Sequence, residues 1–466
     1  MRKNRAVNQP ETVHFIGIGG IGMSAIARIL LARGQSVSGS DSRESVTTMQ
    51  LRAAGARVAI GHQAENIGSA TTVVASSAIE VDNPEYRAAL EAHVPIVKRG
   101  EMLARLMAGR RGIAIAGTHG KTTTTAMVAT MLLHANLDAT MLVGGEVTAM
   151  ATNARDGGGE WFLTEADESD GSFMSLTPAI GVVTNIENDH IASDADFPEL
   201  CKAFGRFLDK LPDVGAAIVG ADNPYSAALA ARARRARTLT FGLSRDADVR
   251  AVDVRHVGLG SSFELFEGAE RLGTIELRVP GEINVVNALG ALATGRVLRI
   301  PFGALAEALH AFAGVRRRFE VLASTARMTV VDDYAHHPTA VRATIAAARR
   351  YHNGPLVVAF QPHRFTRTAY LADAFADALA GADSVVLTPI YAAAEAPIPG
   401  VSERAIGHPL AARGIDVRYA SDVESLVPML LERAPQGALV LMLGAGTITE
   451  SAARLAQALA PVRAAR

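Results

Sequence analysis

The chain has few cysteine, lysine and aromatic residues. Its 466 positions hold one cysteine, Cys201, five lysines and 5% aromatic residues. A single cysteine excludes an intramolecular disulfide, which fits a reducing compartment. Cys201 lies in an ordinary helical pattern, so we expect a small, buried side chain there rather than a nucleophile.

An excess of charge and long apolar runs are also missing. Lys+Arg is 46 and Asp+Glu is 47, so the net charge is −1 and no general basic field exists for nucleic acid or an anionic membrane. The apolar stretch near the N-terminus is broken by glycines and by Arg28, which favours a strand, a turn and a helix over a signal peptide. No other uncharged stretch reaches about 18 residues. We therefore expect a cytoplasmic protein without membrane insertion, either a monomer or a homodimer.

What remains is a globular composition arranged in a repeating pattern. Apolar residues make up 49% and charged residues 20%, and the length predicts about two to four domains. Short apolar runs bounded by Gly, Pro, Ser or Asp alternate with longer helical patterns, which predicts an α/β fold with parallel sheets covered by helices. Between about residues 235 and 280, alternating polar and apolar residues predict antiparallel strands instead.

The strongest motif is GIAIAGTHGKTTTT. It predicts a buried strand ending at Ala116, a turn from Gly117 to Gly120, and a helix that begins with Lys121 and Thr122. Backbone N–H groups of such a turn can surround phosphate oxygens, and the helix N-terminus favours their charge. Lys121 would reach the β- and γ-phosphates, and the Thr122 hydroxyl can bind Mg²⁺. The alternative is a solvated turn with a chance match.

A second glycine loop lies near the N-terminus. Gly17, Gly19 and Gly22 follow a predicted strand with G-x-G-x-x-G spacing, and Asp41 closes the next strand. This spacing is typical of sites for a dinucleotide or a nucleotide diphosphate. Tight packing of helix against strand is the alternative explanation of the glycines.

Acidic residues follow two further strands. Because ligands of open α/β sheets lie beyond the carboxyl ends of the strands, we expect both segments to face the Lys121 loop. An oxygen-rich corner beside a triphosphate suggests Mg²⁺, although most of these acids can equally be solvated. The residues are Glu165, Asp167, Glu168 and Asp170 in the first segment, and Glu187, Asp189 and His190 in the second.

Two segments nearer the C-terminus combine histidine, arginine and aspartate. A zinc site is one interpretation of the histidines, but the arginines favour the binding of an anionic substrate. The residues are Asp332, Asp333, Tyr334, His336 and His337 in VVDDYAHHPTA, and His363, Arg364 and Arg367 in VVAFQPHRFTRT.

In their order along the chain, these motifs resemble the Mur ligases. The resemblance runs from HFIGIGGIGMS through AGTHGKTTT, EADESDGSF, VVTNIENDH, NVVNA and GVRRRFE to DDYAHHP, QPHRFTRT and GAGTI. It implies three α/β domains. They are a Rossmann-like UDP-sugar-binding domain at 1–111, a P-loop-type ATPase domain with a parallel and a small antiparallel sheet at 112–315, and a Rossmann-like amino-acid-binding domain at 316–466.

The resemblance also implies site residues. The UDP-sugar residues are Gly17, Gly19, Gly20, Gly22, Met23, Asp41, Ser76, Ser77 and Arg99. The ATP residues are Gly117, Thr118, His119, Gly120, Lys121, Thr122, Thr123, Asn284, Asn287, Arg317 and Asp332, and the metal ligands are Thr122, Glu165 and His190. The amino-acid residues are Tyr334, His336, His337, Arg364 and Arg367, and the catalytic residues are Lys121, Glu165, His190 and Asp333.

The implied activity is an ATP- and Mg²⁺-dependent ligation in peptidoglycan precursor synthesis. The sequence is similar to the branch that joins L-alanine to the carboxylate of UDP-N-acetylmuramate through an acyl phosphate, with His190 and Asp333 as candidate proton acceptors. One alternative is the related ligase that attaches a recycled peptide to the same sugar nucleotide, although GIGGIGMS and ESDGSF favour the alanine-adding branch. Another is a dehydrogenase that binds NAD at the first glycine loop.

A third alternative is an inactive nucleotide-binding homologue. The sequence departs from the family pattern at three positions, since Ile283 stands where the family usually has His, and Ala192 and Thr447 stand where it often has Asp. Lys121, Thr122 and Glu165 are all present, however, and their presence favours an active enzyme.

Overall fold

The computed structural model describes residues 11–168, 171–188, 196–232 and 236–459. The described residues divide into two compact units. The first comprises 11–168, 171–188, 196–232, 236–249 and 290–305, and the second comprises 250–289 and 306–459. The three predicted domains, with boundaries at residues 111 and 315, stay a prediction.

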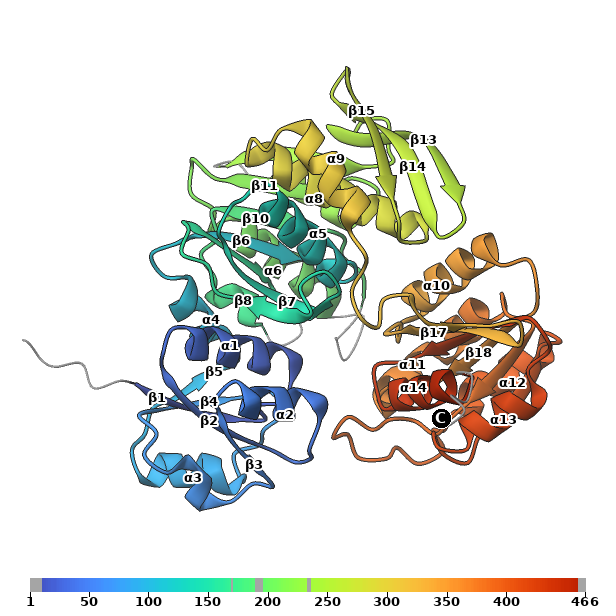
Figure 1. Cartoon of the computed structure of the whole chain (residues 1–466), viewed down its shortest axis with the longest axis horizontal. Coiled ribbons are helices and arrows are strands. Elements are labelled where there is room, and N and C mark those ends of the chain that lie inside the picture. Colours follow the sequence, from blue (N-terminus) through green and yellow to red (C-terminus); the bar gives the residue numbers. More distant parts are fainter. Residues whose placement is uncertain (1–10, 169–170, 189–195, 233–235, 460–466) are drawn as a thin grey trace, which may run out of the picture. The chain divides into compact units, whose positions relative to one another are not determined.

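The first unit begins with a parallel sheet in the order β3-β2-β1-β4-β5 (blue in Figure 1). Successive side chains of a strand point to opposite faces. Accordingly, Phe15 of β1 packs with Met23 of α1 and Leu51 of α2, whereas Ile16 packs with Ala89 of α3. Both faces are covered, as parallel sheets require. The elements are β1 (Thr12–Ile16), α1 (Ile21–Ala32), β2 (Ser36–Asp41), α2 (Val46–Ala53), β3 (Arg57–Ile60), the 3-10 helix η1 (Ala64–Ile67), β4 (Thr72–Ala75), α3 (Pro84–Glu91), β5 (Ile96–Lys98) and α4 (Arg99–Met107).

The part of the second sheet that lies in this unit has the order β12-β11-β10-β6-β9-β7-β8. Its strands pair in parallel except β7 and β8, which are antiparallel. The prediction of antiparallel strands from about residue 235 was wrong for β12, because β12 continues the parallel sheet beside β11. The strands are β6 (Arg111–Ala116), β7 (Thr140–Val147), β8 (Thr152–Arg155), β9 (Trp161–Glu165), β10 (Ile180–Val183), β11 (Ala216–Gly220) and β12 (Arg237–Gly242).

Helices cover both faces of this sheet. Helix α5 contacts β6, β7 and β9, and its residues from Thr122 to Leu132 are all buried. On the other face Phe204 and Phe207 of α6 pack around Phe173. The predicted helix around Cys201 is confirmed, and Cys201 is partly buried against this core. The helices are α5 (Lys121–His134), the 3-10 helix η2 (Ser172–Ser175), α6 (Phe197–Leu208) and α7 (Pro224–Ala230).

The second unit contains the predicted antiparallel strands. β14 and β15 pair antiparallel, with Phe263 opposite Ile275, and both of these side chains are buried. The helix α8 follows directly. The strands are β13 (Val249–Val257), β14 (Gly260–Glu267) and β15 (Glu270–Leu277). The helices α8 (Glu282–Val297) and α9 (Phe302–Ala311) are each divided between the two units, because residues 290–305 belong to the first.

The rest of the second unit is built on a sheet in the order β16-β17-β21-β18-β19-β20. Its strands are parallel except β16, which runs antiparallel to β17. One face carries a core with α10, α11 and α12, and the other a core with α13 and α14 (Figure 1). The elements are β16 (Glu320–Ser324), β17 (Met328–Asp333), α10 (Pro338–Tyr351), β18 (Leu356–Phe360), α11 (Phe365–Leu379), β19 (Ser384–Leu387), α12 (Arg404–Ala412), β20 (Asp416–Tyr419), α13 (Leu426–Arg433), β21 (Ala438–Leu443) and α14 (Ile448–Leu459).

The predicted α/β class is confirmed. Within the described ranges, no helix is both long and apolar enough to cross a bilayer.

Candidate active site

The predicted phosphate loop joins β6 to α5. β6 ends at Ala116, and α5 begins at Lys121 after Gly120 has adopted the left-handed conformation. Gly117 has a φ of +128°, and a Cβ atom there would lie 2.0 Å from the Thr184 hydroxyl oxygen. The turn therefore requires glycine at position 117 for both conformation and space.

Residues just beyond β10 hold this loop. Asn185 accepts the N–H of His119 at 2.9 Å through its side chain, and the Thr184 hydroxyl donates to the His119 carbonyl oxygen at 2.6 Å. The N–H of Thr118 donates to the Asn185 carbonyl oxygen at 3.0 Å. The sequence analysis did not single out Thr184 or Asn185. A signal for them existed, because the carboxyl ends of neighbouring parallel strands lie at one edge of a sheet.

Lys121 is paired with Glu168. Its ammonium lies 2.8 and 2.9 Å from the two carboxylate oxygens, and it also donates to the carbonyl oxygens of Gly117 at 2.5 Å and Thr118 at 3.2 Å. Burial alone would lower the pKa of Lys121, but the adjacent Glu168 carboxylate raises it. Lys121 is therefore held as a cation at the start of α5. Glu168 was predicted near this loop, but not as the partner of the lysine.

Thr122 and Glu165 form an oxygen-rich corner beside this pair. The Thr122 hydroxyl donates to Glu165 Oε2 at 3.2 Å, and the N–H of Gly144 donates to Oε1 at 2.5 Å. The structure thus brings together two of the three predicted metal ligands. The third, His190, lies outside the described residues, as do Asp170 and Asp189.

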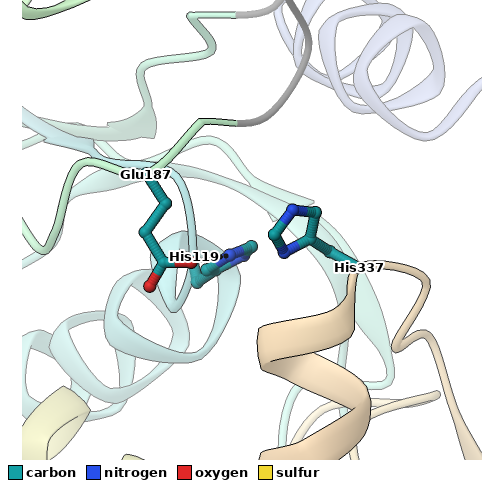
Figure 2. A group of neighbouring side chains, drawn as sticks. All are labelled: His119, Glu187 and His337. Atoms are coloured by element: carbon teal, nitrogen blue, oxygen red, sulfur yellow. Dashed lines mark ion pairs between the residues drawn. The ribbon is translucent and has the colours of Figure 1, made fainter. Parts of the chain in front are cut away.

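The second acidic segment also reaches the loop, as predicted. His119 Nε2 lies 3.3 Å from Glu187 Oε2, and Figure 2 shows this ion pair. The N–H of Glu187 also donates to the Thr118 hydroxyl at 2.9 Å. The predicted ATP residue Thr123 is buried one position beyond Thr122 in the first turn of α5.

The first glycine loop is fastened to the end of β2. The N–H groups of Gly17 and Ile18 both donate to the Ser40 carbonyl oxygen at 2.9 Å. The N–H of Gly19 donates to Asp41 Oδ2 at 2.9 Å. Asp41 therefore supports the loop backbone. If Asp41 also binds a ligand, its carboxylate must accept hydrogen bonds from both the ligand and Gly19.

Other predicted UDP-sugar residues surround this loop. A Cβ atom on Gly22 would lie 3.0 Å from Arg99 Nη1, and one on Gly17 would lie 3.3 Å from Ser76 Cβ. Arg99 also pairs with Asp167 at 3.2 Å, which links the two predicted sites. Gly20 opens α1 as its N-cap residue, and Ser77 is exposed.

Met23, another predicted UDP-sugar residue, is largely buried. Its side chain is 2% exposed and belongs to the hydrophobic core. A role of Met23 in binding the sugar nucleotide stays a prediction.

A buried polar cluster below the first glycine loop was missed. Glu85, on α3, is fully buried and accepts hydrogen bonds from Ser40 at 2.5 Å and from Asn66 at 2.5 Å. His14 Nε2 lies 3.3 Å from Glu85, and its Nδ1 lies 3.0 Å from the Ser38 hydroxyl. Burial alone would raise the pKa of Glu85, but hydrogen bonds from His14, Ser40 and Asn66 lower it to about 2.

In the second unit, the predicted ATP residues Asn284 and Asn287 lie in the first turns of α8. Asn284 donates to the Pro280 carbonyl oxygen at 2.7 Å, and Asn287 donates to the Asn284 side-chain oxygen at 3.1 Å. Ile283, where the family usually has histidine, lines a hollow of about 290 Å³ with Val286 and Ala347.

The carboxylate of Asp333 holds the backbone. Oδ2 accepts the N–H of Phe319 and Oδ1 accepts that of Ala335, both at 2.7 Å. Burial raises the pKa of Asp333. Each oxygen keeps a second lone pair, so the role of Asp333 as a proton acceptor stays a prediction.

Asp332 and Arg317 lie beside one another at the end of β17. Arg317 Nε is 3.9 Å from Asp332 Oδ2, and Arg317 Nη2 donates to the Gly444 carbonyl oxygen at 2.8 Å. The Thr449 hydroxyl donates to Asp332 at 2.5 Å. Burial raises the pKa of Asp332 to about 6, and the nearby Arg317 cation stabilises the ionised form of its carboxylate.

The predicted amino-acid residues form a row of rings and guanidinium groups. The His336 ring lies 5.0 Å from the Tyr334 ring and 5.5 Å from the His363 ring. Tyr391, which the sequence analysis missed, stacks on His363 at 5.6 Å. Arg364 and Arg367 follow His363 at the start of α11, and His337 is the buried N-cap residue of α10.

Comparison with known proteins gives matches along most of the chain. The model described as "Mur ligase family, catalytic domain" matches residues 12–111, "Mur ligase middle domain" matches 115–295, and "Mur ligase, glutamate ligase domain" matches 317–446. A UDP-N-acetylmuramate–L-alanine ligase of Syntrophotalea carbinolica is 45% identical over 96% of this chain and 98% of its own. One from Xanthomonas oryzae is 47% identical over 94% and 93%.

Solved structures agree with these relatives. The UDP-N-acetylmuramate–alanine ligase of Thermotoga maritima has a TM-score of 0.84 at 29% identity, covering 96% of this chain and 98% of its own. A murein peptide ligase from Psychrobacter arcticus shares the fold, with a TM-score of 0.75 at 23% identity over 98% and 100%. The ordered loops, the acidic corner and these matches lead to one conclusion: the chain belongs to the Mur ligase family.

Proposed function

We propose that this chain joins L-alanine to the carboxylate of UDP-N-acetylmuramate, with ATP as the phosphoryl donor, in peptidoglycan precursor synthesis. The observation that carries the proposal is the corner formed by Lys121, Thr122 and Glu165 beside a glycine turn. The 45% identity to ligases of that name supports the choice of substrates. Such substrates favour a cytoplasmic location. The three family models, which match 12–111, 115–295 and 317–446, support the proposed three-domain division.

The proposed reaction has two steps. A carboxylate oxygen of the sugar attacks the γ-phosphorus of ATP, the bond to ADP breaks, and an acyl phosphate forms. The amine of L-alanine then attacks the acyl carbon, and inorganic phosphate leaves. Lys121 is suited to balance charge on the transferring phosphoryl group, since it lies at the N-terminus of α5 with only 15% of its side chain exposed. For this it must exchange the Glu168 carboxylate for phosphate oxygens.

Thr122 and Glu165 fit a magnesium ion by their chemistry. Both offer oxygen, which Mg²⁺ prefers, and their oxygens lie 3.2 Å apart at the phosphate loop. When bound, the ion would supply positive charge to the phosphoryl oxygens. Gly144 fixes the direction of the Glu165 carboxylate through its N–H. We propose Thr122 and Glu165 as the described part of the site and retain His190 as its third ligand and as the candidate proton acceptor.

Phosphate release from ATP tests the proposed function directly. With UDP-N-acetylmuramate and Mg²⁺ present, L-alanine should stimulate release, and the product should contain the new amide bond. Stimulation by L-alanyl-D-glutamyl-diaminopimelate alone would instead favour the peptide-recycling ligase. No stimulation by either acceptor, with ATP still bound, would exclude a ligase.

Glu165→Gln should raise the Mg²⁺ concentration that gives half-maximal activity by about 10- to 100-fold. The substitution keeps a hydrogen-bond acceptor for Gly144 but removes the negative charge that attracts the ion. A Mg²⁺ titration of phosphate release measures the effect. Glu160→Gln is the matched control, because Glu160 is an exposed residue just before the same strand. An unchanged Mg²⁺ requirement in Glu165→Gln would remove Glu165 from the metal site.

A further inference from the structure

Arg364 has a backbone conformation that residues with side chains rarely adopt. As the N-cap residue of α11 it has φ +72° and ψ 140°, a region that glycine alone enters without strain. Such strain persists only where the surroundings fix it, often at functional sites. The strain falls on a residue of the proposed L-alanine subsite.

Hydrogen bonds fix the peptide groups on both sides of Arg364. Its N–H donates to the Tyr391 carbonyl oxygen at 2.8 Å, and the N–H of Tyr391 donates to the Pro362 carbonyl oxygen at 2.8 Å. The Arg364 carbonyl oxygen accepts the Thr368 hydroxyl at 2.8 Å. The segment after β19 therefore holds the residue that opens α11.

Glu395, at the end of that segment, reaches the same turn. Its Oε2 accepts the N–H of Thr366 at 3.1 Å, and its Oε1 accepts the Thr366 hydroxyl at 2.7 Å. Arg364 Nη1 lies 3.6 Å from Oε1. The carboxylate is 20% exposed and the Arg364 side chain 46%. Glu395 thus places a negative charge at the first turn of α11 and pairs with the guanidinium of Arg364.

The two residues before Glu395 also have a strained backbone conformation. Ala393 and Ala394 have φ values of +50° and +67°, a left-handed conformation that is unfavourable for alanine. The N–H of Glu395 closes the turn by donating to the Ala392 carbonyl oxygen at 3.0 Å. Two alanines thus adopt an unfavourable backbone, and the turn they form returns the Glu395 carboxylate to α11.

We propose that Glu395 is a positioning residue that sets the direction of the Arg364 guanidinium in the L-alanine subsite. The inference rests on the proposed function, in which an arginine fork binds the carboxylate of the amino acid. Without the Glu395 carboxylate, the backbone of Arg364 stays fixed through Tyr391, but its guanidinium loses its partner.

Glu395→Gln should raise the KM for L-alanine about 10-fold or more, because small displacements of a positioning group have effects of that size or larger. The KM values for ATP and UDP-N-acetylmuramate should stay unchanged. Glu424→Gln is the control, since Glu424 is an exposed carboxylate elsewhere in the second unit. Equal losses for all three substrates, together with a lower Tm, would mean a merely structural role and overturn the proposal.

A double-mutant cycle tests whether Glu395 acts through Arg364. In an Arg364→Lys background, Glu395→Gln should add little to the KM for L-alanine, since coupled residues are not additive. Fully additive effects would contradict the proposal. If the wild-type enzyme shows no L-alanine-dependent release, the proposed function fails. Hydrogen exchange at Thr366 then decides: faster exchange in Glu395→Gln supports the positioning contact, and unchanged exchange overturns it.

Discussion

Replacing Lys121 by alanine is expected to slow L-alanine-dependent phosphate release by about 10³-fold or more. The partly buried ammonium lies at the end of the phosphate loop and donates to the carbonyl oxygens of Gly117 and Thr118. No other lysine of the chain lies in this loop. The loss should appear in kcat at saturating substrates, because charge on the phosphoryl group develops in the transition state.

The design must separate lost chemistry from lost stability. Lys121→Ala leaves the buried Glu168 carboxylate without its cation, and breaking such a pair costs about 3–5 kcal/mol. The double variant Lys121→Met with Glu168→Gln removes both charges and should recover most of the stability, but not the activity. Lys202→Ala is the control, because Lys202 forms only a surface pair with Glu199. A Lys121→Ala enzyme with wild-type kcat would exclude the lysine from phosphoryl transfer.

Replacing Glu85 by glutamine should destabilise the protein by about 3 kcal/mol, although Glu85 is not one of the proposed catalytic residues. The carboxylate accepts hydrogen bonds from the buried Ser40 and the partly buried Asn66 and lies beside the buried His14. An amide cannot accept all of these bonds through its one oxygen. Urea unfolding monitored by circular dichroism measures the change. Glu91→Gln, an exposed position at the end of the same helix, should have no effect.

The same carboxylate predicts a pH dependence. Its pKa falls from an ordinary value of 4.5 to about 2 in the folded protein. The folded state therefore binds the proton less readily than the unfolded state, and the stabilisation is fully present above pH 4.5. It should be lost as the pH falls from 4.5 toward 2, and the loss should be smaller in Glu85→Gln. Parallel stability curves for the two proteins in this window would refute the assignment.

Local patterns in the sequence predicted the loops, but not the partners of their residues. The turn from Gly117 to Gly120 was predictable because a strand, glycines, a lysine and a threonine follow one another directly. The Lys121–Glu168 pair joins residues 47 positions apart, and the choice of Glu168 over Asp167 depends on how the chain turns after β9. No periodicity in a single sequence records that turn.

Long-range register explains the other misses. Glu85 and His14 are 71 positions apart and meet only because α3 covers the face of β1 to which His14 points. The contacts of the Asp333 carboxylate with the backbone N–H groups of Phe319 and Ala335 were likewise not predicted. Alternating polarity suggested antiparallel pairing for β12, which its place beside β11 overrides. In each case tertiary neighbours, rather than local propensity, decided the outcome.

Gly117 has a consequence for how this enzyme can change under selection. Its φ of +128° and the contact of 2.0 Å that a Cβ atom would make with Thr184 exclude every other residue without a shift of the loop. An inhibitor that binds the backbone here would therefore meet a surface that single substitutions cannot readily reshape. Resistance to such an inhibitor would have to arise through substitutions of neighbouring side chains. An inhibitor that contacts only the Gly117 peptide group would leave few such positions.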